Sequence, residues 1–275
     1  MQYRNKTALV TGASAGIGAA YARGLASRGC DLVLVARRAG RLEEIAGELR
    51  QTHGVKTYVV PADLSAPGSA AQVRAATDSL GLNVSVLVNN AGFGSYGPYE
   101  TIAAQLDHDQ VMVNVANLVA MTHAFLPPMV ERGDGAVLNI SSIAAFQPIP
   151  YMAVYGASKA FILSFSEALW HENRKRGVKV IGVCPGATDT EFFDVVGNDD
   201  EVVFGRKVPP SAVVDQSLRA LERGRCSVVI GASNKISTKA PRFVPRALAA
   251  RISGNVTRPR HAVDNPAGAP SAAAV

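Results

Sequence analysis

TALVTGASAGIG, residues 7–18, joins a short apolar run to a turn that contains three glycines. The run is apolar throughout, which is typical of a buried strand. Gly12 suits a tight turn, Gly16 lets the backbone approach a pyrophosphate, and Gly18 lets a following helix pack closely on the strand. The N-terminus of that helix would offer free N–H groups to an anion. The spacing is not Gly-x-Gly-x-x-Gly, so a plain glycine-rich turn stays open as the alternative.

The same alternation of apolar run and helical pattern continues along the chain. The runs predicted as strands are 7–12, 31–36, 57–60, 85–90, 136–141, 179–184 and 227–231. The segments predicted as helices are 16–28, 39–52, 68–80, 101–131, 152–176 and 210–223. Apolar strands separated by helix-length segments indicate a parallel sheet covered on both faces. We therefore predict a single α/β domain over residues 1–235, with a doubly wound, Rossmann-type sheet of seven parallel strands.

Residues 236–275 are predicted to be a basic C-terminal extension. Between 235 and 260 there are seven basic residues and no acidic one, and the rest of the chain nearly balances, with 21 basic and 22 acidic residues. FVPRALAARIS (243–253) has the pattern of a short amphipathic helix, and NPAGAPSAAAV at the end is typical of disorder. The charge distribution argues against nucleic-acid binding. A solvated face or flexible tail is the favoured interpretation, and weak contact with an anionic membrane surface stays open.

Composition narrows the class of protein further. The chain has 48% hydrophobic and 18% charged residues and no apolar run of 18 residues, so we expect a globular protein without a transmembrane segment. The N-terminus shows no signal-peptide core, so we expect a cytoplasmic location. Cys30, Cys184 and Cys226 are predicted to be free thiols. The five histidines show no metal-ligand spacing, and we predict no metal site.

The end of the second predicted strand bears on cofactor choice. An NAD site usually has an acidic residue here for the adenosine ribose, whereas this chain has Ala36, Arg37 and Arg38. A guanidinium can bind a 2′-phosphate through two hydrogen bonds. The sequence therefore favours NADP(H), with NAD(H) left open and with two ordinary surface arginines as the alternative.

Polar residues also follow the third and fourth predicted strands. Asp63 and Leu64 follow the third, and Asn90, Ala91 and Gly92 follow the fourth. Carboxyl ends of parallel strands meet at one sheet edge, so these residues could contact the adenosine of a dinucleotide. Asp, Asn and Gly are also ordinary turn residues, so turn chemistry stays open.

A candidate proton donor follows the fifth predicted strand. Tyr155 and Lys159 are four residues apart and therefore share a helix face, with small residues between them. The ammonium is expected to lower the pKa of the phenol, which could then protonate an alkoxide or deprotonate an alcohol. Ser142 could donate to the substrate oxygen. Asn114 could hold a water or a backbone group, or could be a satisfied core amide.

Together these segments resemble the short-chain dehydrogenase/reductase family. The matching segments are TGASAGIG, Asp63–Leu64, NNAG, Asn114, Ser142, YGASK and PGATDT (185–190), in the family's order across about residues 5–231. The resemblance implies a catalytic tetrad of Asn114, Ser142, Tyr155 and Lys159. It implies cofactor contacts from the glycine turn (Gly12, Ser14, Gly16, Ile17, Gly18), from Tyr155 and Lys159, and from Pro185, Gly186, Thr188 and Thr190. It also implies a homodimer or homotetramer formed through 101–131 and 152–176. One departure is that Ser14–Ala15 stand where many NADP-using members have a basic residue.

The substrate side is expected to be apolar. Residues 187–208 interrupt the strand–helix rhythm and are predicted to form a lid. Aromatic and aliphatic residues at the same edge are Phe93, Tyr96, Phe146, Ile149 and Tyr151. The leading hypothesis is an NADPH-dependent carbonyl reductase or secondary-alcohol dehydrogenase for a bulky apolar substrate, with Tyr155 as general acid/base. The alternative is a non-catalytic NADP(H)-binding sensor or scaffold with a basic interaction tail.

Overall fold

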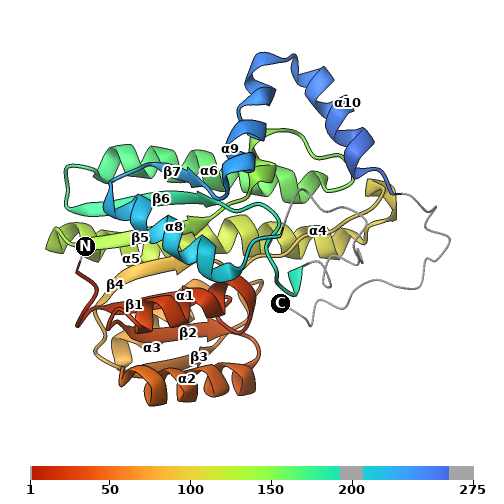
Figure 1. The fold of residues 1–275 in the computed structure, drawn as a ribbon. Helices are drawn as coiled ribbons and strands as arrows, with labels where there is room; N and C mark the ends of the chain where they lie inside the picture. The colour runs from red at the N-terminus through yellow and green to blue at the C-terminus, as the bar shows by residue number, and fades with distance from the viewer. Residues whose placement is uncertain (1, 193–206, 260–275) are drawn as a thin grey trace.

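The computed structural model describes residues 2–192 and 207–259, apart from the side chain of Arg242 (Figure 1). Its centre is one sheet of seven parallel strands. They are β1 (Thr7–Thr11), β2 (Asp31–Ala36), β3 (Thr57–Pro61), β4 (Val84–Asn89), β5 (Gly135–Ile140), β6 (Val178–Cys184) and β7 (Ser227–Val229). The spatial order is β3-β2-β1-β4-β5-β6-β7, so the winding direction reverses between β1 and β4. The predicted sheet is confirmed, and the reversal fixes where a ligand binds in such sheets.

Helices cover both faces of the sheet (Figure 1). On one face lie α1 (Gly16–Ala26), α2 (Ala39–His53) and α8 (Pro210–Glu222), whose apolar side chains form a core cluster with β1 and β2. On the other lie α3 (Ser69–Ser79), α5 (Leu118–Arg132) and α6 (Ala153–Asn173). Most sheet positions are fully buried, in agreement with the near-continuous apolar strands of the sequence.

The segment predicted as one helix over 101–131 has three parts. A 3₁₀ turn (Tyr99–Thr101) precedes α4 (Ala104–Val111), and a π-helical stretch, η2 (Met112–Asn117), separates α4 from α5. The run Ala104–Arg132 is long and apolar enough to cross a membrane by length and composition alone. Met121, Phe125 and Met129 of this run are buried against the sheet, and a core helix passes the same test of length and composition.

The C-terminal part continues beyond the sheet as α9 (Ala232–Ser237), a 3₁₀ turn (Ala240–Phe243) and α10 (Arg246–Thr257), which project from one end of the molecule (Figure 1). The predicted helix over 243–253 is therefore present, shifted toward the C-terminus. The predicted domain boundary after residue 235 falls inside α9.

The Tyr96 hydroxyl donates to the Thr257 carbonyl oxygen at 2.9 Å, and the Thr257 hydroxyl donates to the Pro150 carbonyl oxygen at 3.0 Å. These bonds tie α10 to the loops near the ends of β4 and β5, whereas the predicted disordered end lies outside the described residues.

Candidate active site

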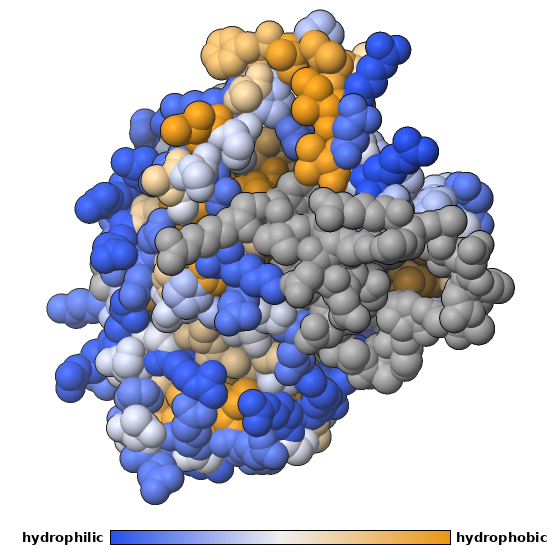
Figure 2. All heavy atoms as spheres, turned by 45° about the vertical axis from the view of Figure 1, so that its right-hand side comes forward, coloured by the Kyte–Doolittle hydropathy of each residue, from blue (hydrophilic) through white to orange (hydrophobic). Residues whose placement is uncertain are grey.

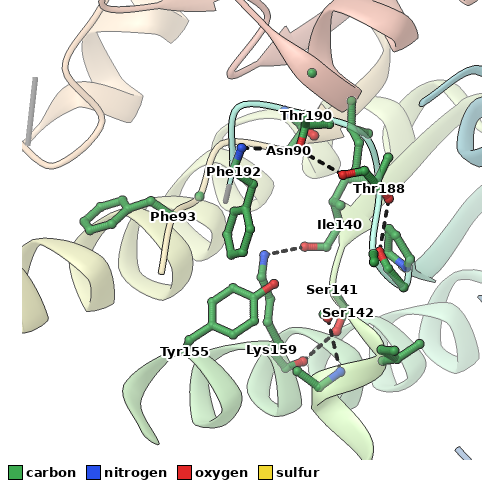
Figure 3. Close-up of a pocket in the computed structure, with 18 of the residues that line it drawn as sticks. Asn90, Phe93, Ile140, Ser141, Ser142, Tyr155, Lys159, Thr188, Thr190 and Phe192 are labelled. Atoms are coloured by element: carbon green, nitrogen blue, oxygen red, sulfur yellow. Dashed lines mark hydrogen bonds between the residues drawn. The ribbon is translucent and has the colours of Figure 1, made fainter. Parts of the chain in front are cut away.

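A cavity of about 580 Å³ lies at the carboxyl ends of β1, β4, β5 and β6 (Figure 3). The glycine turn after β1 and the NNAG segment after β4 form one side of it, at the point where the strand order reverses. Tyr155 and Lys159 of α6 and Ser142 after β5 form another side. Segments that are far apart in the sequence therefore meet at the sheet edge where ligands bind in this architecture.

The glycine turn has the shape that the sequence predicts. Gly12 and Gly16 have φ values of +64° and +52°, a conformation that residues with a Cβ rarely adopt. A Cβ at Gly12 would lie 2.8 Å from Asn90 Nδ2, because that amide donates to the Thr11 and Gly12 carbonyl oxygens at 3.0 and 3.3 Å. The first residues of α1, Gly16 and Ile17, line the cavity. No side chain caps this helix, so its first backbone N–H groups have no hydrogen-bond partner from a capping side chain.

Tyr155 and Lys159 project from α6 into the cavity (Figure 3). The Lys159 Nζ lies 5.6 Å from the centroid of the Tyr155 ring and donates to the Ile140 carbonyl oxygen at 3.0 Å. Lys159 is only 6% exposed, although it carries an amine. The Tyr155 ring also packs against Phe192, with 5.3 Å between ring centroids. The phenol and the amine are thus held close together with restricted access to water.

Ser142 and Asn114 are the other two residues of the predicted tetrad. Ser142 lines the cavity and forms a hydrogen bond with the Tyr155 phenol, and its hydroxyl also accepts from the Ala144 N–H at 3.1 Å. Asn114 is fully buried behind the cavity wall in the π-helical stretch. Its amide donates to the Phe93 carbonyl oxygen at 2.9 Å and to the Ser158 hydroxyl at 3.1 Å. Asn114 therefore holds a backbone group, and its amide is also fully satisfied within the core, so its catalytic role stays a prediction.

Residues 6–201 match the family model described as short chain dehydrogenase. The chain belongs to the short-chain dehydrogenase family. It is 40% identical over 193 residues to a very-long-chain 3-oxoacyl-CoA reductase of Anas platyrhynchos, a match that covers 68% of this chain and 61% of that protein. It is 34% identical over 232 residues to a 7beta-hydroxysteroid dehydrogenase of Collinsella aerofaciens, covering 83% of this chain and 87% of that one.

Solved structures of family members superimpose on most of the chain. A 7beta-hydroxysteroid dehydrogenase structure covers 92% of this chain and 98% of its own, with a TM-score of 0.83 and 31% identity. A short-chain dehydrogenase from Sphingobium yanoikuyae in complex with NADPH covers 89% and 98%, with a TM-score of 0.77 and 34% identity. The predicted family membership is confirmed.

Most residues that sequence analysis assigned to the cofactor lie around one cavity. Those that line it are Gly12, Ser14, Gly16, Ile17, Arg38, Asn90, Ala91, Gly92, Tyr155, Lys159, Pro185, Gly186, Thr188 and Thr190. Gly18 lies behind the turn, where an added Cβ would collide with the Gly12 carbonyl oxygen. The uncapped helix and the glycine cradle suit a dinucleotide pyrophosphate, so the residues present fit the cofactor that this family uses.

Besides Gly18, three further predicted cofactor residues, Arg37, Asp63 and Leu64, lie outside the cavity lining. Leu64 is buried in the apolar core. Asp63 accepts hydrogen bonds from the Ser65 N–H at 3.0 Å and the Ser65 hydroxyl at 2.7 Å. Burial raises the pKa of Asp63, but the Ser65 hydrogen bonds and the nearby Arg37 charge outweigh it, so this pKa is below its ordinary value. The turn chemistry that the sequence left open for Asp63 is therefore present, and its contact with adenosine stays a prediction, as does that of Arg37.

The electrostatics of the proton donor differ from the sequence prediction. Burial raises the pKa of Tyr155 to about 12, and the hydrogen bond with Ser142 acts in the opposite direction. Burial also lowers the pKa of Lys159 to about 8. The prediction that the Tyr155 pKa falls is therefore wrong for this arrangement, because loss of hydration affects both groups more than their mutual interaction does. At neutral pH the phenol is protonated, which is the form that can donate a proton to an oxyanion.

The rest of the cavity is predominantly apolar. Phe93, Phe146 and Ile149 line it as expected, and Phe192 lines it as well. Tyr96 packs against the apolar cluster that contains Ile149, and Tyr151 is outside the lining. Most of the predicted lid lies outside the described residues. Sequence analysis missed Met152 and the C-terminal residues Ser233, Asn234, Ser237, Thr238 and Val256, all of which line the cavity. No local motif marks these residues: Met152 immediately precedes α6, and the other five are brought to the site by the fold of the chain beyond β7.

Proposed function

We propose that the chain catalyses hydride transfer between NADP(H) and the carbonyl or secondary-alcohol carbon of a bulky apolar substrate. The observation that carries this proposal is the convergence of Ser142, Tyr155 and Lys159 on one apolar cavity that the glycine turn also lines. The relatives' names support the class, since the similar proteins are a 3-oxoacyl-CoA reductase and a 7beta-hydroxysteroid dehydrogenase. No observation specifically favours the sensor hypothesis.

The chain's own residues supply the proton chemistry. When bound, the reduced cofactor supplies a hydride to the substrate carbon. Ser142 donates a hydrogen bond to the substrate oxygen, and the protonated Tyr155 gives its proton to the oxygen as negative charge develops there. Lys159, protonated below about pH 8, places a positive charge beside the phenol and stabilises the phenolate that remains. Phe192 and Phe93 limit access of water to the reacting groups.

A panel of carbonyl substrates tests the substrate class. Loss of reduced-nicotinamide absorbance would be followed with a polycyclic ketone, a bulky aryl ketone, a 3-oxoacyl thioester and a ketose. The apolar lining predicts that the polycyclic and aryl ketones have the higher kcat/KM and that the ketose is turned over poorly. NADPH bound without turnover of any member would favour the sensor or scaffold instead.

Arg38 and Glu191 provide the test of cofactor preference. The Arg38 guanidinium donates to the Ser14 hydroxyl at 3.2 Å and to the Glu191 carboxylate at 3.0 Å. A 2′-phosphate on Arg38 would have to compete with that carboxylate. We therefore expect Glu191→Gln to tighten NADPH binding a few-fold and Arg38→Gln to weaken it about tenfold or more, with little change for NADH in either variant.

Isothermal titration of both cofactors would measure these effects. Arg41→Gln is a matched control, because Arg41 is an exposed arginine of α2 paired with Glu44 and outside the cavity lining. Equal loss of NADH and NADPH binding in Arg38→Gln would contradict a role for Arg38 in recognising the phosphate. A homodimer or homotetramer through α4, α5 and α6, and a cytoplasmic location, stay predictions.

A further inference from the structure

Helix α10 exposes its large apolar side chains to solvent, which is the opposite of an ordinary surface helix. Ala249, Ser253 and Thr257 follow each other at intervals of four and are buried against the body. Leu248, Ile252 and Val256 form the adjacent stripe, and they are 44%, 54% and 59% exposed. An amphipathic helix of a water-soluble domain normally turns its large apolar residues inward. Here the small and polar residues face inward and the large aliphatic ones face outward.

The exposed apolar side chains of the described residues gather at this end of the molecule. Of nine large hydrophobic residues with exposed side chains in the described part of the chain, five lie between Ile236 and Val256. Ile236 is 76% exposed and Phe243 is 86% exposed. Figure 2 shows hydrophobic side chains gathered at the upper end of the molecule, where α9 and α10 project, with hydrophilic ones beside them. Such clustering marks an interaction surface rather than scattered surface residues.

The charges among these apolar residues are all positive. Lys235, Lys239, Arg246, Arg251 and Arg258 are exposed, and residues 232–259 contain no Asp or Glu. Apolar side chains interspersed with lysine and arginine are the composition of helices that lie in the interface of an anionic bilayer. A second copy of the chain is a poor occupant, because symmetric pairing of this surface would place like charges opposite each other.

The same surface borders the candidate active site. Val256 is both exposed and part of the cavity lining, as are Ser233 and Ser237 of α9. The Tyr96–Thr257 and Thr257–Pro150 hydrogen bonds hold α10 beside this opening. A surface bound there would face the cavity rather than the distant side of the domain.

We propose that the exposed face of α9, the following 3₁₀ turn and α10 binds the surface of an anionic phospholipid membrane, with the active-site cavity opening toward the lipid. Leu248, Ile252, Phe243 and Ile236 enter the acyl–headgroup boundary, and the lysines and arginines contact lipid phosphates. The proposal requires only peripheral binding, with no segment crossing the bilayer.

Co-sedimentation of the full chain with lipid vesicles tests the proposal without any substrate. Vesicles of phosphatidylcholine alone are compared with vesicles containing about one third phosphatidylglycerol, at low and high salt. We expect binding to the anionic vesicles that weakens as salt increases. Leu248→Ser/Ile252→Ser should weaken binding about tenfold or more, and Arg246→Gln/Arg251→Gln should weaken it about thirtyfold. Both positions of each pair are outside the cavity lining, so turnover of a water-soluble ketone should be unchanged. Unchanged turnover would also show that the variants are folded.

Matched controls distinguish vesicle binding by this surface from nonspecific binding by exposed apolar or basic residues elsewhere. Leu80→Ser removes an equally exposed leucine beyond α3, and Arg223→Gln/Arg225→Gln removes two exposed arginines after α8; both should bind like the wild type. Equal losses in the controls, equal binding to both vesicles regardless of salt, or no binding to either would overturn the proposal. A dimer that Leu248→Ser/Ile252→Ser dissociates, without vesicle binding, would assign the surface to a second copy and overturn it as well. Vesicle binding does not depend on catalysis, so these outcomes leave the proposed oxidoreductase function to its own test.

Discussion

Tyr155→Phe should lower kcat for carbonyl reduction by about a thousandfold while leaving the affinity for NADPH nearly unchanged. The phenol lines the cavity, and the Lys159 Nζ lies 5.6 Å from its ring centroid, so we assign Tyr155 as the group that gives the proton. Phenylalanine keeps the ring contacts with Phe192 and Lys159 and removes only the hydroxyl. The free energy of unfolding should change by only about 1 kcal/mol, because one hydrogen bond with Ser142 is lost.

Three measurements separate catalysis from binding and folding in this variant. Turnover is followed by nicotinamide absorbance, NADPH affinity by calorimetry, and stability by urea denaturation. Tyr99→Phe is the matched control, since Tyr99 is 66% exposed and outside the cavity lining, and it should behave like the wild type. If Tyr155→Phe kept a tenth or more of the wild-type kcat, another group would have to supply the proton.

The fold could be predicted from sequence because its determinants are local. Each strand is an apolar run of a few residues, and each run is followed by a turn residue and a helical pattern, so both ends of all seven strands are predicted to within two residues. The glycine turn was equally local, since Gly12 and Gly16 need positive φ and sit directly after β1. Only β7 is markedly shorter than its apolar run, ending at Val229.

The remaining features depend on contacts between distant segments. The π-helical stretch that carries Asn114 has no spacing of its own in the sequence, and the hydrogen bond from the Asn114 amide to the Phe93 carbonyl oxygen joins segments 21 residues apart. Val256 reaches the cavity because Thr257 bonds Pro150, which lies 107 residues earlier in the chain. The pKa of Tyr155 was predicted in the wrong direction because helical spacing places the amine near the ring but says nothing about how little water reaches either group.

Lys159→Met should abolish most turnover and yet leave the folded chain at least as stable as the wild type at pH 7. Burial lowers the pKa of Lys159 from its ordinary 10.5 to about 8, so holding the charged amine in the folded state costs about 3 kcal/mol. Methionine has a similar length and no charge. Against this gain, the Ile140 carbonyl oxygen loses its 3.0 Å donor, a loss of about 1–3 kcal/mol. The net expectation is a variant between equal and about 2 kcal/mol more stable.

The difference in the free energy of unfolding between Lys159→Met and the wild type should change with pH. Below about pH 8 the amine is protonated in both the folded and the unfolded chain, so its cost is fully present and constant. Between about pH 8 and 10.5 the unfolded chain binds the proton and the folded chain does not, so the stability that Lys159 subtracts is recovered as pH rises. The advantage of Lys159→Met should therefore shrink and then reverse by pH 10, where the wild type has lost the charge but keeps the polar contact.

Urea denaturation of the variant and the wild type at several pH values measures this effect. The difference between their free energies of unfolding reports on Lys159, because the other lysines are the same in both proteins. Lys179→Met is the matched control, because its amine also donates to a backbone carbonyl, that of Glu222 at 3.0 Å, from a more accessible position on β6. A difference between Lys159→Met and wild type that stayed flat from pH 7 to 10 would show that burial does not penalise this charge. A stability gain joined to loss of turnover would instead mean that the site keeps a cation at a cost to folding because the neighbouring phenol needs that charge when it gives up its proton.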